Sequence, residues 1–271
     1  MSESIAWYGL SAFQYLHFGK GPEVIIALHG YGECSRSFLF LEHVIEPGFR
    51  LIAIDLPFHG GTRWKEDRAF TASDLANVIA QVLSDLRLGV AAYILMGYSL
   101  GGRVALGFTQ EKPQQVNRLV LLAPDGIKLN IWYWFATQTR VGVSLFRFTM
   151  KSPGWIFLIL RVANFLRLIN KSVSRFVSGY LHESTQRMLL FQRWTNLRKF
   201  KPRLAKIRTE IREKQLPVRL MYGEYDRIIL PAGAKRLCAG LETHCQVRVI
   251  KTGHQLMTPK HAGAITKLLT T

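Results

Sequence analysis

The sequence predicts an α/β protein built on a mostly parallel β-sheet with helices on both faces. Short β-branched runs alternate with longer helical patterns, the runs are mostly apolar rather than alternating, and one segment interrupts this order. Strands without polar alternation are typical of parallel sheets covered on both faces. With 271 residues, the chain is long enough for one large domain that carries an insertion.

Six apolar runs are the expected buried strands, and helical patterns lie between them. One pattern, 71–86, has apolar residues at helical spacing and begins with two candidate caps, Thr71 and Ser73. The segments 234–241 and 262–269 are expected to form further crossover helices. The predicted strands are 23–28, 51–54, 91–96, 116–122, 218–222 and 246–250.

The alternation is broken once, between residues 126 and 214, where the sequence becomes helical, aromatic and basic. This segment holds 18 lysines and arginines against three acidic residues, whereas the rest of the chain holds 18 against 15. Most of the net charge of +18 therefore belongs to it. We expect residues 1–125 and 215–271 to form the sheet domain, and residues 126–214 to form a helical cap inserted into it.

A candidate nucleophile lies where an apolar run ends and a helical pattern, 102–108, begins. Residues 97–101 read Gly-Tyr-Ser-Leu-Gly. At a sharp turn from strand to helix, the serine backbone is strained toward positive φ, and the residues two before and two after it pass too close for side chains. Gly97 and Gly101 occupy those positions, so Ser99 is the expected nucleophile.

Serine needs a histidine to take its proton and a carboxylate to orient that histidine. Asp226 and His254 each come just beyond a predicted strand, at the sheet edge where open α/β sheets carry their sites. Asp125, at the end of strand 116–122, is an alternative acid. Asp226 is favoured because it lies one strand before the histidine.

An oxyanion intermediate needs two backbone N–H donors. Leu100, which follows the nucleophile, is one candidate. Tyr31 is the other, because glycines on both sides, in Gly30-Tyr31-Gly32, allow its amide to turn inward.

These features together resemble the α/β-hydrolase fold family of serine hydrolases. The resemblance implies an eight-stranded sheet, a helical cap after the sixth strand, and a Ser99, Asp226, His254 triad. It also implies that His29 shapes the oxyanion loop. Phe58 stands where the family often has glycine, and serine at the elbow argues against epoxide opening or halide removal. The matching segments are His29-Gly30, Asp55-Leu56-Pro57-Phe58-His59-Gly60, residues 97–102, Leu122-Ala123-Pro124, Gly223-Glu224-Tyr225-Asp226 and Gly253-His254.

Composition limits the remaining possibilities. Three cysteines, an odd number without metal-ligand spacing, predict free thiols and a cytoplasmic location. Residues 1–12 do not form a secretory signal, and the apolar run 155–169 is too short and too charged to span a bilayer. The histidines lack metal-binding spacing, so we expect no metal and no cofactor. Nucleic acid is not an expected partner, since no recognisable binding module is present.

The basic segment allows two interpretations. Ser152-Pro153 predicts a helix start, and the helix that follows places basic and apolar residues on opposite arcs. Either the apolar arc covers the active site while the arginines face solvent, or the segment docks on anionic lipid with Trp132, Tyr133, Trp134, Trp155 and Trp194 at the interface. The arcs comprise Arg161, Asn164, Arg167, Lys171, Ser174 and Arg175, and Val162, Phe165, Leu166, Ile169, Val173, Phe176 and Val177.

The predicted function is therefore hydrolysis of a carboxylic ester or thioester with a lipophilic acyl group, through an acyl-enzyme. An apolar cap favours such substrates because burial of hydrocarbon is favourable. Two alternatives remain: an acyltransferase with the same triad, and a non-catalytic protein that binds a membrane or another anionic surface.

Overall fold

The computed structural model describes residues 1–128, 130–165 and 182–270, without the side chains of 160–165. The chain divides into two compact units. The first contains Met1–Lys128 and Lys199–Thr271, and the second contains Leu129–Arg198.

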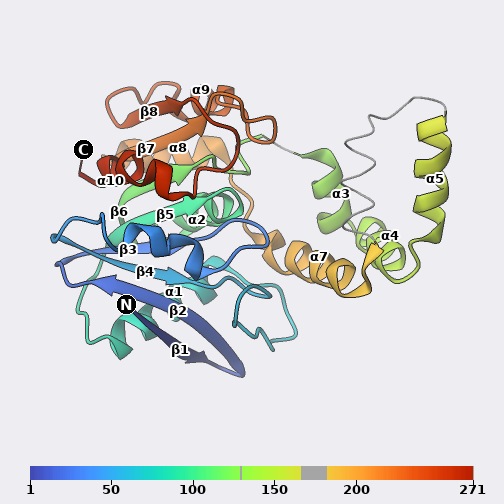
Figure 1. Ribbon diagram of the computed structural model, residues 1–271, viewed down its shortest axis with the longest axis horizontal. Helices are drawn as coiled ribbons and strands as arrows, with labels where there is room; N and C mark the ends of the chain where they lie inside the picture. Colours follow the sequence, from blue (N-terminus) through green and yellow to red (C-terminus); the bar gives the residue numbers. More distant parts are fainter. Residues whose placement is uncertain (129, 166–181, 271) are drawn as a thin grey trace. The chain divides into compact units, whose positions relative to one another are not determined.

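The first unit is built on an eight-stranded sheet with the strand order β1-β2-β4-β3-β5-β6-β7-β8 (Figure 1). Only β2 runs antiparallel to its neighbours, and all pairs from β4 to β8 are parallel. This confirms the predicted fold class. The strands are β1 (Ser2–Tyr8), β2 (Ser11–Gly19), β3 (Glu23–Leu28), β4 (Phe49–Ile54), β5 (Tyr93–Tyr98), β6 (Val116–Leu122), β7 (Val218–Gly223) and β8 (Cys245–Ile250).

Helices cover both faces of this sheet. On one face α10 packs against the 3-10 helix η1, and on the other α1, α2, α8 and α9 pack in succession (Figure 1). Their apolar faces and the central strands form the core, in which every residue of β5 and β7 is buried. The bounds are η1 (Ser35–Leu41), α1 (Ala72–Asp85), α2 (Leu100–Glu111), α8 (Leu204–Glu213), α9 (Ala232–Cys238) and α10 (Ala262–Thr270).

The carboxyl-terminal limit of the second unit differs from that of the predicted insertion. We expected the sheet domain to resume at residue 215, but it resumes at Lys199. The reason is packing: α8 is amphipathic, and it buries Ile207 and Ile211 while it contacts α2 and α9. Its many charged residues face outward, so its composition resembles that of the basic segment although it belongs to the first unit.

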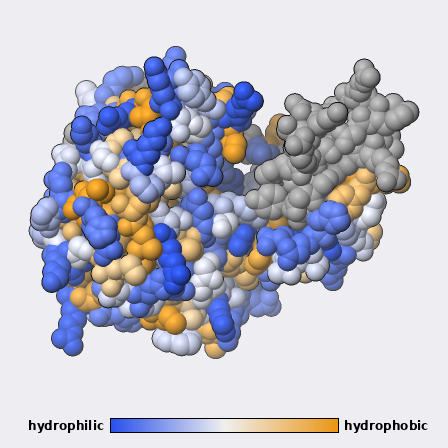
Figure 2. Space-filling view, viewed as in Figure 1, coloured by the Kyte–Doolittle hydropathy of each residue, from blue (hydrophilic) through white to orange (hydrophobic). Residues whose placement is uncertain are grey.

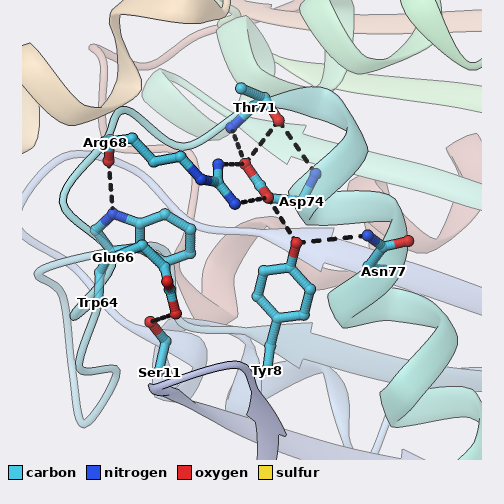
Figure 3. Close-up of polar contacts among 8 residues, drawn as sticks. All are labelled: Tyr8, Ser11, Trp64, Glu66, Arg68, Thr71, Asp74 and Asn77. Atoms are coloured by element: carbon cyan, nitrogen blue, oxygen red, sulfur yellow. Dashed lines mark hydrogen bonds and ion pairs between the residues drawn. The ribbon is translucent and has the colours of Figure 1, made fainter.

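A buried carboxylate ties the start of α1 to the β1–β2 hairpin and to the loop before the helix (Figure 3). Thr71 caps α1 and forms a capping box with Asp74. Asp74 also accepts hydrogen bonds from Arg68 at 2.6 and 2.7 Å and from the Tyr8 hydroxyl at 2.7 Å. Trp64 donates to the carbonyl of Arg68 in the same cluster, so one side chain orders three segments.

The second unit is helical, with α3 (Ile131–Gln138), α4 (Arg140–Lys151), α5 (Gly154–Phe165) and α7 (Ser184–Asn196). Asn130 and Thr139 cap the first two helices through their side-chain oxygens. The rings of Tyr133 and Phe146 pack edge-on and tilted, respectively, against Trp194, and these aromatic pairs hold α3, α4 and α7 together.

The described part of the second unit includes the predicted helix start. α5 begins at Gly154, directly after Ser152-Pro153. The arcs predicted from Arg161 to Arg175 and from Val162 to Val177 lie outside the residues whose side chains the structure describes. Among the helices described in either unit, none combines the length and apolarity that crossing a bilayer requires.

Candidate active site

Ser99 lies at the turn between β5 and α2 with a strained backbone. Its φ is +49° and its ψ is −109°, a conformation that side-chain-bearing residues rarely adopt. A Cβ on Gly97 would overlap the backbone of Gly101, and a Cβ on Gly101 would overlap the carbonyl oxygen of Leu28. The two glycines therefore let β5 approach the start of α2 and let α2 approach the end of β3, and the first turn of α2 begins directly after the serine.

His254 bridges Ser99 and Asp226. Its Nε2 lies 3.1 Å from the Ser99 Oγ, and its Nδ1 lies 2.7 Å from the Asp226 Oδ2. The three residues follow the carboxyl ends of β5, β7 and β8, which run parallel and therefore end at the same edge of the sheet. The structure thus brings together the three side chains that the sequence analysis selected.

The Asp226 carboxylate is fully buried and holds the histidine in one orientation. Its other oxygen accepts hydrogen bonds from the backbone N–H groups of Ile228 and Ile229, at 2.8 and 2.9 Å. Because an ionised carboxylate can only accept, the proton of the neutral imidazole belongs on Nδ1. The lone pair of Nε2 then faces the Ser99 hydroxyl, as a general base requires.

Asp125 has different partners. Its carboxylate forms an ion pair with Arg103 of α2 and accepts the backbone N–H of Gly126 at 2.6 Å. It therefore anchors the chain after β6 to α2.

The two predicted oxyanion donors lie on the expected loops. Leu100 is the first residue of α2, where backbone N–H groups have no partner within the helix. Tyr31 lies in the loop after β3. The His29 side chain ties this loop to the segment after β4: the His29 Nδ1 donates to the Gly30 carbonyl, and the His29 Nε2 accepts from the Leu56 N–H. Phe58, in the turn after β4, has a φ of +63°, which explains why glycine is common there in the family it resembles.

Two further residues lie against the site. Tyr98 donates from its hydroxyl to the His254 carbonyl oxygen at 2.9 Å, and its ring lies 5.5 Å from the imidazole, centroid to centroid. Glu33 accepts the Gly30 N–H at 3.2 Å, and burial raises the pKa of its carboxyl above the ordinary value. The sequence analysis selected neither residue for the site.

Comparison with known proteins identifies the family of the fold. The family model described as alpha/beta hydrolase fold matches residues 23–258. The chain belongs to the α/β-hydrolase fold family. The matched residues span the strands from β3 to β8 and include Ser99, Asp226 and His254.

Individual relatives are distant but extend over most of the chain. The uncharacterized hydrolase YugF of Bacillus subtilis is 24% identical over 91% of this chain and 88% of its own. The pimeloyl-[acyl-carrier protein] methyl ester esterase of Nitrosomonas europaea is 28% identical over 80% of this chain and 81% of its own. The thioesterase domain from the curacin biosynthetic pathway has the same fold, with a TM-score of 0.61, 17% identity, and coverage of 100% of this chain and 99% of that domain. The chain is thus similar to α/β-fold hydrolases.

Proposed function

We propose that this protein is a serine hydrolase that cleaves a carboxylic ester or thioester through an acyl-enzyme intermediate. The observation that carries this proposal is the continuous hydrogen-bonded path from Ser99 through His254 to Asp226. A buried carboxylate, an imidazole with one free lone pair and a strained serine are the groups that nucleophilic acyl transfer needs.

In the proposed mechanism, His254 Nε2 takes the Ser99 proton as Oγ attacks the acyl carbon. The backbone N–H groups of Tyr31 and Leu100 stabilise the oxyanion that forms. The tetrahedral intermediate then collapses, and His254 gives its proton to the leaving alcohol or thiol. Water, activated by the same imidazole, attacks the acyl-enzyme and releases the acid, which returns Ser99 to its starting state. Asp226 balances the charge of the imidazolium in both halves of the reaction.

Two observations support a lipophilic acyl group. The loop that carries Asp226 exposes three large apolar side chains, Tyr225, Ile228 and Leu230. Exposed apolar side chains on a loop of the proposed active site favour hydrocarbon over a polar acyl group. In addition, a relative of similar length is named for a methyl ester of an acyl-carrier substrate. The role of residues 126–214 as a cap stays a prediction.

The proposal is tested by hydrolysis of p-nitrophenyl esters and acyl thioesters of increasing chain length, with Ser99→Ala beside the wild type. We expect turnover to rise from two-carbon to medium or long acyl groups and to be lost in Ser99→Ala. Equal turnover of all chain lengths would contradict the lipophilic substrate. Preferential formation of a new ester when a competing alcohol is added would instead show the acyltransferase alternative.

We also propose that the second unit contacts an anionic membrane surface. Residues 129–198 contain ten lysines and arginines and one acidic residue, Glu183. On α4 the exposed side chains of Val141, Leu145 and Phe148 follow one another at helical spacing and form one apolar face.

The aromatic residues of the second unit divide into two groups. Trp132 of α3 is 82% exposed, whereas Tyr133 and Trp194 pack against each other inside the unit. Figure 2 shows apolar and hydrophilic residues side by side on the visible surface of the described part. Exposed tryptophan and apolar side chains among cations are typical of surfaces that lie at a lipid interface. Trp132 and the apolar face of α4 are therefore the proposed contact, and the cytoplasmic side of a membrane is the proposed location.

A further inference from the structure

The segment that carries His254 has little regular structure of its own. It follows β8, and residues 251–258 contain neither helix nor strand. Local backbone bonds shape it: the Leu256 N–H donates to the His254 carbonyl, and the Tyr225 N–H donates to the Thr252 carbonyl. These bonds fix the loop internally and to the loop that bears Asp226. They do not join it to the strand that carries the nucleophile.

Tyr98 makes that connection. It is the last residue of β5 and directly precedes Ser99, and it is 4% exposed. Its hydroxyl donates to the His254 carbonyl oxygen at 2.9 Å, while its ring lies against the imidazole with an interplanar angle of 31°. One side chain thus contacts both the backbone and the ring of the histidine.

The Tyr98 ring also lies close to the oxyanion loop. A Cβ on Gly30 would lie 2.9 Å from two carbons of the ring, so the loop can approach only because this residue is glycine. The Gly30 N–H in turn donates to Glu33. Tyr98 therefore packs against both the loop that carries Tyr31 and the loop that carries His254.

The Tyr98 hydroxyl is fixed as a donor. Burial, and then the negative charges of Glu33 and Asp226, raise the pKa of this phenol well above its ordinary value of 10.0. The proton stays on the oxygen across the range in which an imidazole works as a base, so the hydroxyl keeps its bond to the carbonyl and does not compete as a catalytic base.

We infer that Tyr98 is a positioning residue, which holds the His254 imidazole over Ser99 Oγ by binding the histidine backbone from the nucleophile strand. The inference rests on the proposed serine hydrolase function. During the reaction Nε2 must first take a proton from Oγ and then deliver it to the leaving group, and each transfer needs the ring within hydrogen-bonding reach. Without the hydroxyl, the loop can carry the ring away from Oγ while the substrate site stays intact.

Tyr98→Phe tests this inference because it keeps the ring and removes only the hydroxyl. Tyr93→Phe is the matched control: Tyr93 lies on the same strand, is equally buried, and donates from its hydroxyl to Gln115 at 3.2 Å. With p-nitrophenyl octanoate, we expect Tyr98→Phe to lower kcat by about 5- to 10-fold with KM unchanged, as loss of one hydrogen bond implies. The rate of labelling by a fluorophosphonate should fall by a similar factor. Tyr93→Phe should leave both rates at the wild-type level.

The outcomes separate this inference from the proposed function. If Ser99→Ala abolishes hydrolysis but Tyr98→Phe has the kcat of Tyr93→Phe, the inference is wrong and the proposed function remains. A rise in KM alone in Tyr98→Phe would also overturn it, since the hydroxyl would then act on substrate binding. If Ser99→Ala hydrolyses the ester as fast as the wild type, both fail together. Thermal unfolding of the two tyrosine variants checks that both are folded.

Discussion

At the scale of single residues, the two candidate acids provide a direct comparison. Asp226→Asn should lower kcat by about 10⁴-fold, because an amide can donate to Nδ1 and favours the wrong imidazole tautomer. Asp125→Asn should keep most of the activity and lose about 1–3 kcal/mol of stability, because Arg103 is buried and would lose its ionic partner. Ester hydrolysis and thermal unfolding of both variants check this. Full turnover in Asp226→Asn with none in Asp125→Asn would reverse the assignment.

The glycines at the serine turn differ in their surroundings from other glycines of the chain. Gly101→Ala should cost about 3 kcal/mol or more and abolish activity, because the new methyl would overlap the carbonyl of Leu28 on β3. Gly263→Ala is the control, since nothing lies within 4 Å of that position in α10, and alanine there should stabilise the helix by about 0.5–1 kcal/mol. Unfolding in urea measures both changes. Equal stability of the two variants would contradict the close packing described for the turn.

The sequence was sufficient to select Ser99, Asp226 and His254 because each follows a recognisable apolar strand, and parallel strands end at one edge. Tyr98 and Glu33 could not be assigned in the same way. Their contacts depend on how irregular loops fold over the sheet, and neither residue type is restricted to functional sites. The only signal for Tyr98 was that it directly precedes Ser99 in the sequence, and a residue at that position can also serve for packing alone.

At the scale of secondary-structure elements, the Asp74 cluster is expected to control the stability of α1 and of the β1–β2 hairpin (Figure 3). Burial alone would raise the pKa of Asp74, but hydrogen bonds from Arg68, Thr71 and Tyr8 outweigh it and hold the pKa below the ordinary value of 3.8. Asp74→Asn should therefore cost about 2–3 kcal/mol at pH 7.

The pH dependence of this contribution follows from its sign. A carboxyl whose folded pKa is depressed stabilises fully above its unfolded pKa, at about pH 4, and loses that contribution as the pH falls further. The Tm difference between wild type and Asp74→Asn should thus be largest near pH 7 and shrink below about pH 4. Glu3→Gln, which breaks the exposed pair with Arg36, should leave Tm unchanged. A Tm difference for Asp74→Asn that stays constant down to pH 2 would contradict the assigned ionisation.

The elements also show what the sequence pattern could and could not predict. The strands from β3 to β8 were predicted because they are mostly apolar and lie between helices. The expectation of burial is wrong for β8, which is largely exposed because it lies at the edge of the sheet. β1 and β2 were not predicted: Ile5 and Trp7 face solvent on the edge strand, and β2 alternates between buried and partly exposed residues, so neither is apolar throughout. α8 was assigned to the wrong unit for a different reason. Its many charged residues resemble those of the basic segment, although its two buried isoleucines pack it on the first unit.

At the scale of the whole molecule, the distribution of charge leads to a prediction about membranes. The protein should sediment with vesicles that contain an anionic phospholipid, remain in solution with neutral vesicles, and dissociate as salt increases, because the attraction is electrostatic. Trp132→Ala should weaken binding, whereas Trp7→Ala should not, although Trp7 is itself 67% exposed in the first unit. Equal recovery with both kinds of vesicle at all salt concentrations would contradict the proposed contact.

The central claim is that folding makes Ser99 reactive through His254 and Asp226. The most direct test is reaction of the intact protein with a fluorophosphonate, followed by mass spectrometry to locate the modified residue, in the wild type and in His254→Ala. We predict stoichiometric modification of Ser99 in the wild type and at least a hundredfold slower labelling in His254→Ala, about the contribution of general base catalysis. Equal labelling rates in the two proteins, or a wild type that stays unmodified, would contradict the claim.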